Sequence, residues 1–125
     1  MIFRGIVNDQ FEAVIRVRLR GPSGAVADIT AVVDTGYSGS LTVSDTVVSE
    51  LRLVRRSGIT VRLADGTPVE LDTFGAEIEW GGGWQRIVVY AVGDEALVGM
   101  RLIAGLRLQI DVAAGGPVDV GPIPP

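Results

Sequence analysis

The stretch AVVDTGYSGS, residues 31–40, decides how this chain is interpreted. Two valines end a strand-like run and lead directly into Asp34, so a carboxylate stands where a buried strand gives way to a loop. Gly36 has no Cβ and lets a backbone N–H approach that carboxylate, while the Thr35 hydroxyl can tie the loop down. The tripeptide alone is weak evidence, because Asp, Thr and Gly all favour ordinary turns.

Strand patterns flank this loop on both sides. Apolar residues alternate with arginines over residues 13–20, and a Gly-Pro-Ser-Gly turn separates this run from a second strand pattern over residues 25–33. Ser44 is the predicted N-cap of a short helix that ends near Leu53, because Asp45 falls in the first turn and valines follow on one face. The strands predicted in this half are 13–20, 25–33 and 41–43.

The second half of the chain continues the strand pattern. Asp65-Gly66 predicts a hairpin turn. The apolar parity slips by one residue near Thr73, which predicts a bulge or bend. Residues 100–104 are expected to form one or two helical turns. The strands predicted here are 59–63, 69–80, 84–92 and 106–112.

The spacing of these segments indicates an all-β domain of about seven or eight strands, arranged as a barrel or a sandwich. We expect one domain over residues 1–114. Residues 115–125 are rich in Gly and Pro, and we expect them to form an extended or disordered tail.

Three missing residue types restrict the chemistry. The chain has no His and no Cys, which excludes Ser-His and Cys-His nucleophiles, zinc or iron sites built on those side chains, and disulfides. It also has no Lys, which excludes Schiff-base chemistry and a P-loop lysine. Carboxylate, hydroxyl and guanidinium groups remain, and we expect neither a metal nor another cofactor.

Charge and hydropathy indicate which partners and which cellular location to expect. The net charge is −4 with both signs interspersed, so nucleic-acid binding is not expected. The longest apolar run, Ile87 to Val92, is far below the ~18 residues that cross a bilayer. Polar residues interrupt the first twenty positions where a signal peptide would be apolar. We therefore expect a cytoplasmic protein without a membrane partner.

Four features in order resemble the retropepsin-like aspartic proteases, a family of retroviral proteases and single-domain prokaryotic relatives. The resemblance covers residues 11 to 112. The features are Val32-Val33-Asp34-Thr35-Gly36, a hairpin around Asp65-Gly66 that matches the family's flap, the apolar-apolar-Gly motif Leu97-Val98-Gly99, and the terminal strand 106–112.

The resemblance implies a closed or partly open acid-protease barrel with a flap hairpin and one or two short helices. It implies an aspartic endopeptidase with Asp34 as the catalytic carboxylate, Thr35 locking two loops together and Gly36 presenting its N–H. Aspartic proteolysis needs two carboxylates that share one proton. The chain has one Asp-Thr-Gly and no Asp-Ser-Gly, so the second carboxylate must come from a homodimer.

The resemblance also assigns residues around the catalytic loop. Leu97, Val98 and Gly99 would pack beneath the loop and brace it. Asp65-Gly66 would close over an extended peptide or protein substrate. Tyr37 departs from the family, which has a small residue or Ser there, so we expect a substrate pocket shaped by its ring and a less acidic optimum than that of pepsins.

Other interpretations stay open. A retropepsin-like domain could bind peptides or dimerise without cleaving, and an unrelated small barrel could carry the tripeptide by accident. Ser38 and Ser40 lack a conventional base. The remaining acidic pairs, Asp94-Glu95 and Glu77 with Glu79, are interpreted as solvated positions rather than metal ligands.

Overall fold

The computed structural model describes residues 2–125; Met1, the first residue of the predicted domain, lies outside the described residues. The elements in chain order are β1 (Phe3–Val7), β2 (Ala13–Arg20), β3 (Val26–Val33), β4 (Leu41–Val43), α1 (Asp45–Glu50), β5 (Val54–Arg62), β6 (Pro68–Trp80), β7 (Gly83–Ala91), β8 (Leu97–Val98), β9 (Leu106–Ile110) and β10 (Pro117–Pro122). The prediction of a β-strand fold with a short helix is confirmed. Within residues 2–125 no helix has the length and apolar content needed to cross a bilayer.

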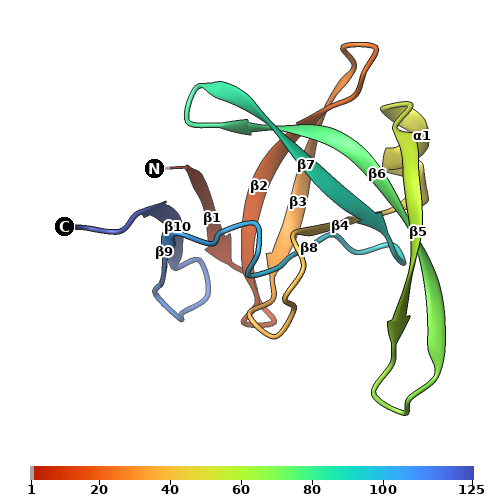
Figure 1. Cartoon of the computed structure of the whole chain (residues 1–125). Helices are drawn as coiled ribbons and strands as arrows, with labels where there is room; N and C mark the ends of the chain where they lie inside the picture. The colour runs from red at the N-terminus through yellow and green to blue at the C-terminus, as the bar shows by residue number, and fades with distance from the viewer. Residues whose placement is uncertain (1) are drawn as a thin grey trace.

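Six strands close into a ring in the order β6, β7, β4, β8, β3 and β2. The ring closes where Leu19 and Arg20 of β2 pair with Ile78 and Glu77 of β6. Beyond the ring, β5 continues the sheet from β6, and β1, β10 and β9 continue it from β2. Figure 1 shows these two extensions at opposite ends, with the β5–β6 hairpin projecting on one side.

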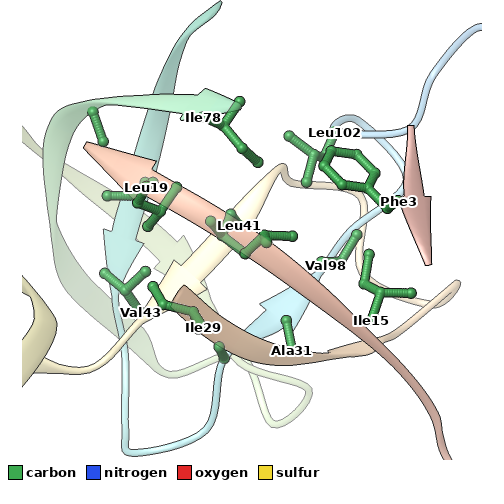
Figure 2. Close-up of a cluster of buried hydrophobic side chains, with 14 of the residues drawn as sticks. Phe3, Ile15, Leu19, Ile29, Ala31, Leu41, Val43, Ile78, Val98 and Leu102 are labelled. Carbon is green, nitrogen blue, oxygen red and sulfur yellow. The ribbon is translucent and has the colours of Figure 1, made fainter. Parts of the chain in front are cut away.

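Alternate residues of the ring strands fill its interior. On β2, Ile15, Val17 and Leu19 are buried, whereas Arg16 and Arg18 between them are exposed. Figure 2 shows Ile15 and Leu19 meeting side chains from β3, β4, β6 and β8. Burying such a side chain stabilises the fold by about 1.5–3 kcal/mol relative to leaving it exposed. The sequence alternation therefore determines which face of β2 turns inward.

The predicted helix is present and begins where its cap was expected. The Ser44 side chain accepts a hydrogen bond from the Val47 N–H at 3.4 Å. After the last turn, Leu51 and Leu53 are buried and anchor the helix to the core.

The prediction of helical turns over residues 100–104 is wrong. This segment consists of turns, in which the Leu102 N–H donates to the Gly99 carbonyl and the Leu106 N–H donates to the Ile103 carbonyl. Leu102 and Ile103 are consecutive and both buried. The Met100 and Arg101 N–H groups donate to the Tyr37 and Gly39 carbonyls, so contacts with the preceding loop hold this segment in turns.

The β5–β6 hairpin has the predicted turn at Asp65-Gly66. The Leu63 N–H donates to the Thr67 carbonyl and the Gly66 N–H donates to the Leu63 carbonyl, each at 2.9 Å. Gly66 has φ +87°, as the last residue of a three-residue hairpin loop requires.

The irregularity expected near Thr73 is present, but the extra residue lies on the partner strand. Arg55 pairs with Phe74 and Ser57 pairs with Thr73, so Arg56 of β5 is bulged. Strand β6 itself runs without interruption against β7. The parity slip in the sequence therefore marks the point where β6 leaves the ring and enters the hairpin.

The C-terminal segment is part of the sheet. Residues 115–125 were expected to form an extended or disordered tail, yet Pro117–Pro122 forms strand β10 between β1 and β9. Val118 and Val120 are fully buried. Their alternation with polar or small residues lets one face of a Gly- and Pro-flanked segment enter the core.

Candidate active site

Asp34 follows the last residue of β3, and its backbone is fixed by the neighbouring strand β8. The Val32 N–H donates to the Ala96 carbonyl and the Asp34 N–H donates to the Val98 carbonyl, both at 2.9 Å. Strands β3 and β8 run parallel, with Val33 beside Val98. The carboxylate therefore starts from a rigid strand end rather than from a free loop.

The loop holds one oxygen of the carboxylate in a defined direction. The Gly36 N–H donates to the Asp34 Oδ1 at 2.9 Å, and the Tyr37 N–H donates to the Asp34 carbonyl at 3.1 Å. A Cβ on Gly36 would lie 3.3 Å from Oδ1, closer than most such contacts. Among the described residues no hydrogen bond involves the second carboxylate oxygen, Oδ2. Asp34 is half-buried, and Thr35 beside it is exposed.

The segment after β8 braces the far side of the loop. The Gly99, Met100 and Arg101 N–H groups donate to loop carbonyls at 2.8–3.1 Å. Their acceptors are the carbonyls of Ser40, Tyr37 and Gly39, respectively. The structure thus brings Leu97, Val98 and Gly99 against the loop that carries Asp34.

Tyr37 turns toward this bracing segment. An ideal Cβ on Gly39 would lie 2.2 Å from the Tyr37 hydroxyl, and one on Gly99 would lie 2.6 Å from the Tyr37 ring. The ring therefore occupies the space beside both glycines. The Tyr37 hydroxyl is buried without a hydrogen-bond partner among the described residues. Burial raises the pKa of this phenol, with a smaller contribution from Tyr90. Its ring lies against the loop and supports it from within.

Two hydroxyls that the sequence interpretation did not assign also hold the site together. The Ser40 hydroxyl donates to the Val88 carbonyl at 2.6 Å. The buried Thr42 hydroxyl accepts from the Leu97 N–H at 2.8 Å and bonds to the Glu95 carbonyl at 3.2 Å. The available signal for Thr42 was its place between two apolar residues in a strand, where a polar side chain needs internal partners.

The hairpin tip forms a separate arm. Asp65 Oδ1 accepts the Thr67 N–H at 2.9 Å, and hydrogen bonds from the Thr67 side chain and backbone lower the pKa of the Asp65 carboxyl. In Figure 1 the hairpin projects away from the ring, toward the same lower side as the loop after β3. In the described part of the chain no hydrogen bond joins Asp65 or Gly66 to Asp34.

The acidic residues Glu77 and Glu79 of β6 lie beside arginines of β2. Glu77 pairs with Arg20 at 3.0 Å, and Glu79 lies 3.8 Å from Arg18. Across residues 2–125 no three acidic side chains converge as a metal site would require.

Two depressions in the surface have no contribution from Asp34 to their lining. One of about 360 Å³ is bordered by Ser40, Tyr90 and Arg101. A larger one, about 1110 Å³, lies over β1, β2 and β3. Neither is lined by Asp34.

Comparison with known proteins identifies the fold of the chain. No family model matches the sequence, and no curated protein sequence matches it. Among solved structures, the chain is similar to a retropepsin-like aspartic protease from Rickettsia conorii. The two share 16% sequence identity over 94% of this chain and 93% of that chain, with a TM-score of 0.56. The chain has the retropepsin-like fold, as predicted; at this identity the likeness establishes the fold alone.

Proposed function

We propose that this retropepsin-like chain is an aspartic endopeptidase that works as a homodimer, with Asp34 supplied once by each copy. The observation that carries the proposal is the orientation of Asp34. Its backbone is tied to β8, and one carboxylate oxygen accepts the Gly36 N–H at 2.9 Å. A carboxylate oriented this firmly at the end of a ring strand suits acid–base chemistry.

The chemistry requires a second carboxylate beside the first. An ionised carboxylate takes a proton from water as the water oxygen attacks the peptide carbonyl carbon. Its protonated partner gives a proton to the carbonyl oxygen. The C–N bond then breaks as a proton passes to the leaving nitrogen. Two carboxyls this close share one proton, because both cannot be ionised in a site of low dielectric.

The remaining residues have roles that follow from their positions. Thr35 is exposed beside Asp34, where its hydroxyl can reach the matching loop of a second copy. The hairpin tip at Asp65-Gly66 would close over an extended peptide and exclude water. A low pKa keeps Asp65 ionised at neutral pH, so it would disfavour acidic side chains in the substrate.

The decisive experiment replaces the proposed catalytic carboxyl. Asp34→Asn should lower cleavage of an unbiased peptide library by at least about a thousandfold, as expected for loss of the acid–base group. Its unfolding midpoint and sedimentation should stay close to those of the wild type. Asp9→Asn, at an exposed turn, is the matched control and should cleave normally.

The competing function has a distinct outcome. A wild-type protein that dimerises but cleaves no peptide between pH 3 and pH 8 would be a peptide-binding or dimerisation module instead.

A further inference from the structure

The depression of about 1110 Å³ over β1, β2 and β3 forms a groove on the outer face of the sheet, the β1–β3 groove. These strands are neighbours in the sheet (Figure 1), so their outward side chains make one continuous floor. The side chains that set its chemistry are those of Arg4, Ile6, Val14, Arg16, Arg18 and Asp28. Small-molecule sites usually measure about 300–1,000 Å³, so this open groove has room for a segment of extended chain.

Two exposed arginines lie side by side at the centre of the β1–β3 groove. Gly5 of β1 pairs with Ile15 of β2, so Arg4 and Arg16, the next residues in this antiparallel register, are cross-strand neighbours. Among residues 2–125 neither arginine forms an ion pair. Like charges in this arrangement destabilise a sheet unless an anion lies between them. The pair therefore has the charge and the geometry to receive a carboxylate.

The nearby carboxylates leave this arginine pair available. Asp28 bonds to Arg18 at 2.8 Å, and Glu79 lies 3.8 Å from the same guanidinium. Asp119 of β10 stands opposite Arg4 in the register, but its side chain forms no ion pair within the described residues. The groove is therefore cationic at its centre and has its charges paired at the end that Arg18 occupies.

An apolar patch lies two residues further along the same strands. Ile6 of β1 pairs with Val14 of β2, and Val14 pairs with Val32 of β3. Ile6 is 55% exposed, and the two valines are half-buried. Residues two apart on a strand share a face and are about 6.6–6.8 Å apart. This is the spacing between the arginine pair and the apolar patch.

We propose that the β1–β3 groove is a docking site, away from Asp34, for an extended segment of a protein substrate in which one residue separates an acidic residue from an apolar one. An extended chain places alternate side chains on one face with the same spacing of about 6.6–6.8 Å. The carboxylate of the segment lies between Arg4 and Arg16, and its apolar side chain covers Ile6 and Val14. The inference deepens the proposed function and rests on it only in calling the segment part of a substrate.

The charges of the groove favour such a segment over a polyanion. Asp28 and Glu79 border the cationic centre, and a nucleic-acid backbone or an anionic membrane would bring a row of negative charges against them. One carboxylate matches the one arginine pair. The apolar end is also the end nearer the candidate active site, because Val32 precedes Asp34 by two residues. A substrate anchored in the groove can therefore continue toward Asp34.

An NMR titration tests where the segment binds. The probe is the peptide Gly-Ser-Glu-Ser-Leu-Ser-Gly, added to ¹⁵N-labelled Asp34→Asn protein so that the peptide stays intact. Amide shifts are expected on β1 and β2 around Arg4 and Arg16. Shifts confined to the Asp34 loop and the hairpin tip would overturn the proposal. So would the absence of shifts at about 5 mM peptide, where even a Kd of about 1 mM leaves most of the protein bound.

A substitution in the arginine pair tests the charge contact. Arg16→Gln should raise the Kd of the peptide about fivefold at low salt, because a charge-assisted hydrogen bond is lost. Arg86→Gln, at an exposed position on β7 outside the groove, is the matched control and should change the Kd by less than about twofold. Both side chains are exposed, so both variants should fold normally. Equal Kd values for the two variants would refute the contact.

Two altered peptides test the spacing. A leucine placed directly after the glutamate points to the other face of the extended chain, and the Kd should rise at least about threefold. Replacing the leucine by serine should have a similar effect, because the apolar contact is lost. If all three peptides bind alike and inorganic phosphate shifts the same amides, the groove is an anion site only and the proposal is wrong.

Cleavage assays separate this inference from the proposed function. With Asp34 intact, Arg16→Gln should raise the KM of a substrate that carries the segment and leave kcat unchanged, whereas Arg86→Gln should change neither. A protein that binds the peptide in the groove but cleaves nothing would keep the docking site and refute the protease. A protein that cleaves normally, with equal KM for the two variants, would refute the docking site alone.

Discussion

Close backbone contacts shape the catalytic loop residue by residue. A Cβ on Gly99 would lie 2.1 Å from the Gly39 carbonyl oxygen, and a Cβ on Gly39 would overlap the Tyr37 ring. No side chain fits at either position without moving the loop. Glycine at these two places leaves room for the Tyr37 ring beside the loop that carries Asp34.

Tyr37 carries a residue-scale prediction. Its buried hydroxyl has no partner among the described residues, so the fold bears the cost of removing it from water. Tyr37→Phe should raise the free energy of unfolding by about 1 kcal/mol, measured by urea denaturation. Tyr37→Ala, which also removes the ring, should lower it by about 3 kcal/mol. A less stable Tyr37→Phe protein would mean that the hydroxyl has a partner after all.

At the scale of elements, the short strand β8 depends on its neighbours. It has two residues, pairs parallel with β3, and its Val98 pairs with Leu41 of β4. Thr42 adds the missing restraint, because its hydroxyl accepts the Leu97 N–H at 2.8 Å. Strand β8 in turn fixes the backbone of Asp34, so a side chain on β4 helps to position the candidate catalytic loop.

Thr42→Val tests this restraint. Valine keeps the shape but leaves the buried Leu97 N–H without its acceptor, so the free energy of unfolding should fall by about 1–3 kcal/mol. Cleavage should fall as well, because the support of Asp34 loosens. Thr30→Val, at an exposed position on β3, is the matched control and should change stability by less than about 0.5 kcal/mol. Equal stability of the two variants would refute the role of Thr42.

At the scale of the whole molecule, ion pairs lie along the line where the ring closes. Arg20 bonds to Glu77 at 3.0 Å across the β2–β6 junction, and its guanidinium lies 4.2 Å from the centre of the Trp84 ring. Arg18 bonds to Asp28 at 2.8 Å on the neighbouring strand. Hydrogen bonds from these arginines lower the pKa of the Glu77 and Asp28 carboxyls.

The lowered carboxyl pKa values predict the pH dependence of stability. Each group releases its proton more easily in the folded chain than in the unfolded chain, whose carboxyls titrate near about pH 4. The unfolded state therefore binds more protons in acid, and stability present above about pH 5 should fall as the pH drops toward 3. Urea unfolding from pH 7 to pH 3 measures this loss. Glu77→Gln should flatten the slope, whereas Glu70→Gln, at an exposed position, should leave it unchanged.

The sequence by itself determined much of the fold and the centre of the site. Three features follow from local patterns: the alternation of apolar and polar residues on β2 and β3, the turn at Asp65-Gly66, and the helix cap at Ser44. Side-chain period and turn chemistry depend on neighbouring residues, so a sequence reveals them directly. Resemblance of the ordered motifs to a known family supplied the link between Asp34 and Leu97–Gly99, which the structure brings together.

Only the tertiary structure decided how distant segments pair. Strand β1 was not predicted, because Gly5 interrupts its apolar pattern; a Cβ there would meet the Val14 carbonyl oxygen of β2. Strand β10 looked like a tail because Gly and Pro flank Val118 and Val120, whose burial depends on β1 and β9 lying on either side. The inward turn of the Tyr37 ring likewise follows from space left by a glycine far along the chain. Periodicity specifies a strand and its faces, but packing between remote segments selects its partners.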